Sequence, residues 1–188
     1  MARDMTKGRI LPQMTAFAIP LILGNLFQIL YNATDSIIVG KFVGDDALAA
    51  VGTAGPIMNM AILFISGMCM GAGILMSTLY GAKDMKNLEK QISTTLIGGL
   101  VFSLLIAFLM IVFAVPILRL INSPEEIIGS AAIYLRVVFL GLIFTFVYNF
   151  LANTLRALGD SRTPLYFLVI SAFLNVAGDL LFVVTLKL

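Results

Sequence analysis

Five long runs without a charged residue dominate this sequence and limit what it can fold into. They cover Ile10–Thr34, Ala47–Tyr80, Gln91–Leu118, Val137–Leu155 and Thr163–Gly178. About 20 residues of helix cross the hydrocarbon core of a bilayer, and backbone groups in lipid must find their hydrogen bonds within the helix. With 60% hydrophobic and only 12% charged residues, the chain is too apolar for a water-soluble fold. We therefore predict an all-α polytopic membrane protein with five transmembrane helices.

We expect residues 1–188 to form a single transmembrane domain. Its helices should cover approximately residues 10–40, 47–80, 91–118, 126–156 and 163–187. The segment Met85–Lys90 should form a short amphipathic connector before the third helix. The odd number of helices leads us to expect that the chain is a truncated part of a longer protein.

The charges and the reactive side chains narrow the possible functions. The net charge of +2 is spread over the loops without a basic patch, so we expect no nucleic-acid partner. The chain has a single cysteine, Cys69, and no histidine, which argues against a disulfide framework, a zinc site or a haem site. We therefore expect no cofactor and no enzyme activity, and the lipid bilayer is an expected partner.

Basic residues alternate between the segments that flank the predicted helices. The flank 1–9 and the loop 83–90 have three each, the loops 41–46 and 119–126 have one each, and the loop 156–162 has two. Cytoplasmic loops carry the excess of lysine and arginine. We therefore predict a multi-pass protein of the cell's inner (plasma) membrane with a cytoplasmic N-terminus.

The first predicted helix carries a line of polar residues inside an apolar run: Asn25, Gln28, Asn32 and Asp35. With about 3.6 residues per turn, these four fall on one face. A polar face inside a membrane has to face partner helices or a cavity. Two further polar lines with a spacing of four follow, namely Thr145, Asn149 and Asn153, and then Ser171, Asn175 and Asp179.

Asp35 and Asp179 stand out because nearly every other charged residue lies in a flank or a loop. They precede the outer ends of their helices by about 9 and 12 Å, so both belong to the outer half of the membrane. A carboxylate at that depth is costly unless it is protonated, paired or bound to a cation. We predict a proton or Na⁺ site at Asp35 and Asp179, and the sequence leaves the choice of ion open. The alternatives are an interfacial position for Asp35 and a structural hydrogen bond between Asp179 and Asn175.

Pro20 lies in the same helix as Asp35, one turn before Gly24. Its ring removes a backbone hydrogen bond and tends to kink a helix. Pro20 is therefore a hinge candidate, and a static kink is an equally good interpretation.

Several motifs, in their order and spacing, resemble those of one transporter family. They are Ile19-Pro20-Leu21 with Gln28 and Asp35; Val39-Gly40; Ala47-Leu48-Ala49-Ala50-Val51-Gly52; Gly81-Ala82-Lys83-Asp84; Tyr148-Asn149; Leu155-Arg156-Ala157-Leu158-Gly159-Asp160; and Asn175 with Asp179. Along its full length the chain is similar to the multidrug and toxic compound extrusion (MATE) transporters, in the branch that includes the DinF-like proteins.

The resemblance implies an antiporter that exports small organic, often cationic, drugs or metabolites in exchange for H⁺ or Na⁺. It implies an ion site of Asp35, Asn175 and Asp179, and bending at Pro20 that couples ion binding to substrate release. The resemblance adds Gln28 and Asn153 as neighbours of this site, and the polar lines described above add Asn32 and Asn149 as possible residues that line the site or the substrate path. Because MATE transporters have two six-helix lobes, the chain should correspond to the first part of the N-terminal lobe and lack a C-terminal lobe, which alternating access requires.

Two other functions compete with this interpretation. A flippase for a lipid-linked sugar, from the same superfamily, should have several basic residues for a pyrophosphate, and here only Arg136 is available. An intramembrane aspartyl protease would use two aspartates that share a proton. The residues before Asp179 read Val176-Ala177-Gly178 and not Gly-x-Gly, which disfavours the protease.

The alternation of basic residues makes the orientation testable. With the N-terminus inside, a cysteine placed at Asp45 should react with an impermeant thiol reagent on whole cells, and one placed at Lys86 should not. Labelling at Lys86 without labelling at Asp45 would contradict the predicted orientation.

Overall fold

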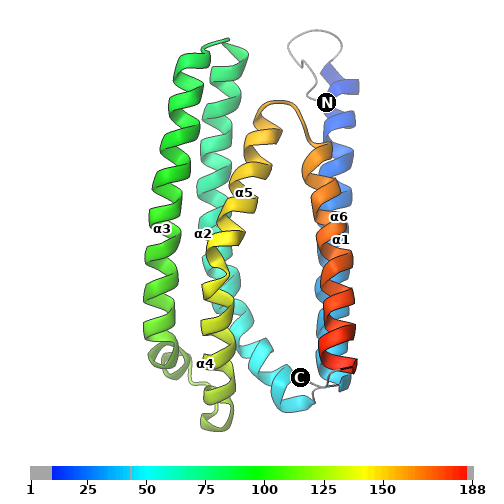
Figure 1. Ribbon diagram of the computed structural model, residues 1–188, viewed down its shortest axis with the longest axis vertical. Helices are drawn as coiled ribbons and strands as arrows, with labels where there is room; N and C mark the ends of the chain where they lie inside the picture. Colours follow the sequence, from blue (N-terminus) through cyan, green and yellow to red (C-terminus); the bar gives the residue numbers. More distant parts are fainter. Residues whose placement is uncertain (1–9, 43, 186–188) are drawn as a thin grey trace. The chain divides into compact units, whose positions relative to one another are not determined.

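A computed structural model of the chain describes residues 10–42 and 44–185, and every regular element in them is a helix (Figure 1). The elements are α1 (Ile10–Phe42), α2 (Asp45–Gly81), α3 (Met85–Leu120), α4 (Glu125–Leu140), α5 (Leu142–Ala157), α6 (Arg162–Asp179) and the π-helix η1 (Leu180–Thr185). The basic N-terminal flank of Arg3, Lys7 and Arg9 lies outside the described residues, as does Lys187.

The helices supply the predicted number of membrane spans. Four of them, α1, α2, α3 and α6, are each long and apolar enough to cross a bilayer. The fifth span is the pair α4 and α5, which bends by 43° at Gly141. The prediction of an all-α polytopic protein with five spans is therefore confirmed, and the break inside the fourth span is a feature that the sequence analysis did not predict.

The connector expected at Met85–Lys90 is instead the beginning of α3. Asp84 caps the helix, because its Oδ1 accepts a hydrogen bond of 3.2 Å from the backbone N–H of Asn87. A capping carboxylate satisfies a free N–H of the first turn and favours an early helix start.

The chain divides into two compact units. The first consists of residues 1–45 and 155–188, and the second of residues 46–154. The assignment of residues 1–188 to one transmembrane domain stays a prediction.

In the first unit, α1 packs against α6 and η1. Gly24 of α1 lies at this contact, since a Cβ atom there would be 3.4 Å from Cδ2 of Leu168 and 3.7 Å from Cδ1 of Leu165. The absence of a side chain at Gly24 therefore lets α1 and α6 come close, which is how small residues act in membrane helix pairs.

The turn that leads into α6 is built around Asp160. Gly159 has φ +87°, and the backbone N–H of Asp160 donates to the carbonyl of Leu155, which closes α5. The carboxylate of Asp160 then accepts hydrogen bonds from the N–H groups of Arg162 and Thr163, both at 3.1 Å, and from Oγ1 of Thr163 at 2.8 Å. This carboxylate thus caps the free N–H groups at the start of α6.

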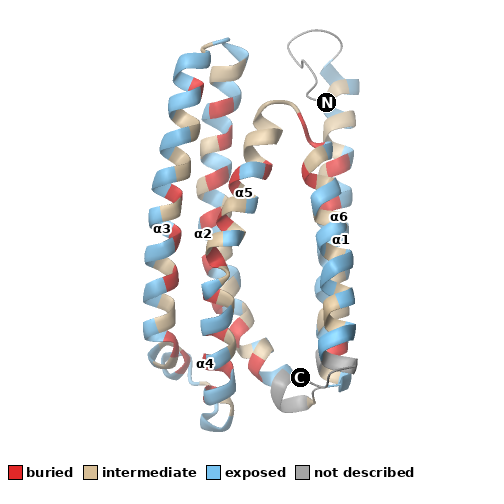
Figure 2. Cartoon of the chain, in the orientation of Figure 1, coloured by how far each residue is buried: buried red, intermediate tan, exposed pale blue. Residues whose placement is uncertain are grey.

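The second unit contains α3 packed on α4, with α5 in contact with α2 and α3. Its largest fully buried side chains include Phe139, Phe146, Leu118 and Leu135. Figure 2 shows buried residues in stripes along α2 and α3 and exposed residues between them. Long apolar side chains such as Ile97 and Phe108 remain exposed, as expected for helices that lipid surrounds.

Phe146 occupies the space beside Gly99, where α3, α5 and α2 meet. A Cβ atom on Gly99 would overlap the ring of Phe146 and lie 3.2 Å from Cε of Met68. Phe146 is fully buried and stacks on Phe150 with 5.9 Å between the ring centroids. Gly99 is therefore a site of close approach between α3 and α5.

This contact predicts that Gly99→Ala destabilises the protein by about 2 kcal/mol or more, because overpacking a well-packed core displaces its neighbours. The measurement is the melting temperature in detergent. Gly98→Ala is the matched control, since a Cβ atom at Gly98 meets nothing within 4 Å. Equal melting temperatures for the two variants would contradict the packing described here.

The Asp160 cap predicts a pH dependence. Burial raises the pKa of Asp160, but the hydrogen bonds from Thr163 and Arg162 outweigh burial and hold its pKa below the usual range. Because the folded-state pKa is lower than the unfolded value of about 3.9, the carboxylate contributes its full stability above that value. The contribution is then lost as the pH falls through the folded-state pKa.

Asp160→Ala should therefore cost about 1–2 kcal/mol at neutral pH, and the difference from the wild type should shrink as the pH falls from about 5 towards 3. Thermal unfolding across this pH range measures the difference. Glu126→Gln, which changes an exposed acid in the first turn of α4, should alter the melting temperature little. A difference for Asp160→Ala that grows with falling pH would contradict the assignment.

Candidate functional site

The two intramembrane aspartates predicted from the sequence meet in the first unit. Asp35 of α1 and Asp179 at the end of α6 are both half-buried, and their carboxyl groups are hydrogen-bonded to each other. Two carboxylates repel each other when both are ionised, so this contact requires a proton or another cation between them. The geometry thus brings together the two residues that we predicted to bind an ion.

The pair is not satisfied within the described part of the chain. Oδ2 of Asp179 is buried and has no hydrogen-bond partner there. An unsatisfied buried carboxyl oxygen is costly in a medium that lacks water. This atom is therefore a position where a donor or a cation would be stabilising.

Asp179 lies where the helix changes its geometry. The α-helical part of α6 ends at Asp179, and the π-helix η1 begins at Leu180. π-helical segments are rare and frequently occur at functional sites. The segment also packs on α1, so the carboxyl pair lies between two helices that remain in contact beyond it.

Tyr31 belongs to the same cluster, and the sequence analysis missed it. Its phenol forms a hydrogen bond with Gln28 and interacts electrostatically with Asp35. Tyr31 follows Gln28 by three residues and precedes Asp35 by four, so helical spacing was the signal that pointed to it. It was overlooked because an aromatic residue was counted with the apolar side chains of the helix.

The other predicted residues of this unit are exposed polar side chains. Gln28 and Asn32 of α1 and Asn175 of α6 are exposed. The side chain of Asn175 makes no hydrogen bond in the described part of the chain, so the predicted alternative of a structural Asn175–Asp179 bond is not what the structure contains. As a ligand in the ion site, Asn175 stays a prediction.

Asn149 and Asn153 belong to the second unit, where they support the packing of α5. Nδ2 of Asn149 donates to the carbonyl of Thr145 at 2.9 Å, and Nδ2 of Asn153 donates to the carbonyl of Asn149 at 2.8 Å. Oδ1 of Asn149 accepts a hydrogen bond of 3.3 Å from Oγ of Ser66 in α2. A Cβ atom on Gly73 of α2 would be 3.5 Å from Cβ of Asn153. Their predicted role in lining the substrate path stays a prediction.

Pro20 is buried within α1, which is one helix from Ile10 to Phe42. The proline thus removes a backbone donor without ending the helix. Its role as a hinge stays a prediction.

Arg136 of α4 is used within the helix pair α3–α4. Its Nε donates to the backbone carbonyl of Ile111 in α3 at 3.3 Å. This hydrogen bond holds the guanidinium at one point of the exposed surface. The apolar stem of the arginine side chain can lie along the helix while its polar end reaches the carbonyl.

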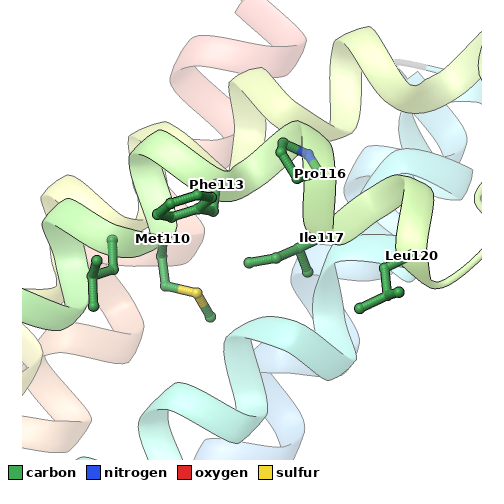
Figure 3. A pocket seen from close by; sticks show the side chains of 6 residues that line it. Met110, Phe113, Pro116, Ile117 and Leu120 are labelled. Carbon is green, nitrogen blue, oxygen red and sulfur yellow. The ribbon is translucent and has the colours of Figure 1, made fainter.

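An apolar groove of about 550 Å³ follows α3 around Pro116 (Figure 3). It is lined by Leu109, Met110, Phe113, Pro116, Ile117 and Leu120. These side chains carry no polar group, so the groove has nothing with which to orient a polar ligand or perform chemistry.

An ion at the carboxyl pair would have to be held by oxygen atoms. The described residues contain no group of three or more His, Cys, Asp or Glu side chains that could hold a metal ion together. Two carboxyl groups with amide and phenol oxygens nearby are hard ligands, which suit a proton or a cation such as Na⁺ and not a thiophilic metal.

Comparisons with known proteins agree with this architecture. The sequence matches the family model described as MatE over residues 20–181. Two relatives from Bacillus subtilis strain 168 are named probable multidrug resistance proteins. YpnP is 35% identical over 97% of this chain and 41% of its own length, and YoeA is 34% identical over 92% of this chain and 37% of its own length.

The fold is similar to the crystal structure of MATE in complex with MaD3S, with a TM-score of 0.90 and 25% sequence identity. That similarity covers 99% of this chain and 42% of the other. The chain thus spans between 37% and 42% of the length of these proteins. Because the family match takes in nearly all of the described helices and the fold agrees with it, the chain belongs to the MatE family, the MATE transporters, as its motifs indicated.

Proposed function

We propose that this chain forms the ion-binding part of a cation-coupled antiporter that exports small organic, often cationic, drugs or metabolites. The observation that carries the proposal is the contact between Asp35 and Asp179 on two membrane-spanning helices, with Oδ2 of Asp179 unsatisfied. A site of this kind binds a cation because removing the cation would leave two like charges close together in a medium of low dielectric constant.

The coupling follows from the same electrostatics. When the pair is loaded with H⁺ or Na⁺, its charge is compensated and the helices α1 and α6 can stay in contact. When the ion leaves, repulsion between the carboxylates favours a conformation that separates them or admits water or a cationic substrate. An ion and a cationic substrate that stabilise different conformations exclude each other, which is what an antiporter requires.

A proton is the ion that the contact between Asp35 and Asp179 favours. A hydrogen bond between two carboxyl groups uses one proton, whereas Na⁺ prefers several oxygen ligands around it. Exposed amides such as Asn175 and Gln28 can supply such oxygens, so a dependence of efflux on Na⁺ distinguishes the two ions.

Substrate export also needs a second half of the transporter. Alternating access works by movement of one half against the other around a central site. Since the relatives are more than twice as long as this chain, we propose that a second lobe acts with it, in a bacterial-type inner membrane with the N-terminus in the cytoplasm. The relatives named as multidrug resistance proteins support a drug-like substrate and no enzymatic step.

Neither alternative function gains support. A flippase needs a basic site for a pyrophosphate, and Arg136 is hydrogen-bonded to the backbone of α3. The carboxyl pair shares with a protease dyad only the closeness of its two carboxyl groups. The sequence before Asp179 departs from the protease motif.

The carboxyl pair predicts the effect of neutralising either acid. In the protein expressed from its complete reading frame, Asp35→Asn and Asp179→Asn should each reduce gradient-driven efflux at least tenfold, because a neutral amide cannot release a proton or carry the charge that holds a cation. Membrane insertion should be retained, since removing a charge lowers its cost. Efflux of a fluorescent organic cation is measured in everted vesicles from pH 6 to 9, with and without Na⁺.

Asp45→Asn is the matched control, because Asp45 begins α2 in the predicted outer connection. It should keep the coupling of the wild type. Efflux that depends on the pH gradient without Na⁺ identifies the proton, and efflux that requires Na⁺ identifies the metal ion. Gradient coupling that persists in both Asp35→Asn and Asp179→Asn would contradict the proposed ion site.

A further inference from the structure

The apolar groove on α3 is a feature of the second unit that the ion site does not use (Figure 3). Its volume is about 550 Å³, and all six residues that line it belong to the segment from Leu109 to Leu120 of one helix. Met110, Ile117 and Leu120 extend from the same side of that helix (Figure 3). Because α3 is long and apolar enough to cross a bilayer, hydrocarbon chains surround this face.

The spacing of the lining residues explains the shape of the groove. On an α-helix, residues three and four positions apart lie on one face. Phe113, Pro116, Ile117 and Leu120 have this spacing, and the short ring of Pro116 lies between the longer side chains of Phe113 and Leu120. The sequence of α3 alone therefore produces the depression, without a second helix.

The neighbouring helices of the second unit leave this face open. α4 packs on another side of α3, where Nε of Arg136 donates to the carbonyl of Ile111. Ile111 and Phe113 are two residues apart, which places them about 160° from each other around the helix. α2 contacts α3 beside Gly99, but the first part of α2, in cyan, leads away from α3 (Figure 1). Phe113 is accordingly 50% exposed.

The length of the groove matches one leaflet of a bilayer. From Leu109 to Leu120 the helix rises by about 16 Å, at about 1.5 Å per residue. Half of a hydrocarbon core of about 30 Å is about 15 Å. An acyl chain that begins beside Leu120, at the end of α3, therefore reaches Leu109 within its own leaflet.

The lining residues favour a hydrocarbon chain over another helix. Helices that pack closely in membranes meet at small residues such as glycine, alanine and serine, which let the backbones approach. The groove is lined by leucine, methionine, phenylalanine, proline and isoleucine. These side chains keep a second helix at a distance but leave space for a thin, flexible chain. They also offer no polar group that would orient a drug.

Charged groups lie where the head group of such a lipid would be. Arg119, next to Leu120, forms an ion pair with Glu125 across the turn to α4, with 3.6 Å between Nε and Oε1. The two side chains are 64% and 76% exposed, so this ion pair contributes little to stability and both groups can take other partners. A phosphate suits the guanidinium, and a primary ammonium suits the carboxylate.

The balance of charges at this end of α3 favours a zwitterionic lipid. Glu126 is exposed beside Glu125, so the start of α4 has two acids close to the one base, Arg119. The negative charge of an anionic lipid is compensated by Arg119 and opposed by both glutamates. A head group with a phosphate and an ammonium compensates both members of the ion pair.

We propose that the groove on α3 binds an acyl chain of a zwitterionic phospholipid of the ethanolamine type, with its phosphate at Arg119 and its ammonium at Glu125. This lipid site lies on the exposed surface of the second unit. It rests on the groove and on the Arg119–Glu125 pair, and it does not depend on the carboxyl pair of the first unit.

Quenching by brominated lipids tests the site in the protein expressed from its complete reading frame. Residues 1–188 contain no tryptophan, so Phe113→Trp adds a reporter in the groove, and the unsubstituted protein gives the background signal. The vesicles contain equal amounts of phosphatidylethanolamine and phosphatidylglycerol, and the acyl chains of only one of the two are brominated. The ethanolamine lipid should quench Phe113→Trp at least threefold more than the glycerol lipid.

Phe108→Trp is the matched control, because Phe108 is 64% exposed on α3 but does not line the groove. There the two lipids should quench equally. Adding Arg119→Gln and Glu125→Gln to Phe113→Trp should remove the preference. Arg119→Lys, which keeps the positive charge that attracts a phosphate, should retain it.

A second measurement needs no tryptophan. In mass spectrometry of the intact protein released from the same vesicles, the unsubstituted protein should keep one more bound ethanolamine lipid than the variant with both Arg119→Gln and Glu125→Gln. Equal numbers of bound lipid would contradict the head-group contacts.

The quenching experiment has three results that would overturn the lipid site. Equal quenching by both lipids at Phe113→Trp would mean that the groove holds bulk lipid only. Stronger quenching by the glycerol lipid would contradict the charge assignment. No quenching at Phe113→Trp, with normal quenching at Phe108→Trp, would show that another segment of the protein covers the groove.

Discussion

A helix surrounded by lipid makes the hydrogen bonds of its backbone groups within itself. The structure depends on how far its polar side chains can also find hydrogen-bond partners within the helix. Ser36 donates to the carbonyl of Asn32, and Thr34 donates to the carbonyl of Leu30, so each hydroxyl finds an acceptor one turn back. A carboxylate has no donor, and the interior of a helix offers no free N–H. Asp35 and Asp179 must therefore be satisfied by each other, by a proton or by a cation, which explains why α1 and α6 meet at these residues.

The fold was largely predictable because the distribution of apolar and charged residues along the chain determines where the helices span the membrane. Charges interrupt the apolar runs at the ends of the spans, so the number and type of the spans could be read from the sequence. The start of α3 at Met85 was missed because the cap formed by Asp84 extends a helix into charged sequence. The bend at Gly141 was missed for another reason. A glycine in an apolar run looks the same whether the helix passes through it straight or bent, and the hydrogen bonds of Val138 and Thr145 decide between the two.

The candidate site was predictable where it depends on charge and spacing, and not where it depends on packing. Asp35 and Asp179 were identified by their depth in apolar runs, and the structure brings them together. Tyr31 was missed because an aromatic ring contributes to apolar composition while its hydroxyl joins the polar cluster. The line of Asn149 and Asn153 was recognised, but its contact with α2 depends on Ser66 and Gly73, which no spacing within one helix could indicate.

The hydrogen bonds inside the helices also bear on the charge of the ligand. One amide N–H of Asn149 and one of Asn153 donate to carbonyls of their own helix, and Nε of Arg136 donates to the carbonyl of Ile111. Each of these amides keeps a second N–H beside its oxygen, so the asparagines offer both donors and acceptors, whereas Asp35 and Asp179 offer acceptors alone when they are ionised. Exposed amides elsewhere offer donors and acceptors equally. The carboxyl groups therefore leave more hydrogen-bond acceptors than donors among these polar side chains. Because acceptors in a medium of low dielectric constant stabilise positive charge and destabilise negative charge, this is the physical reason to propose cationic and not anionic substrates.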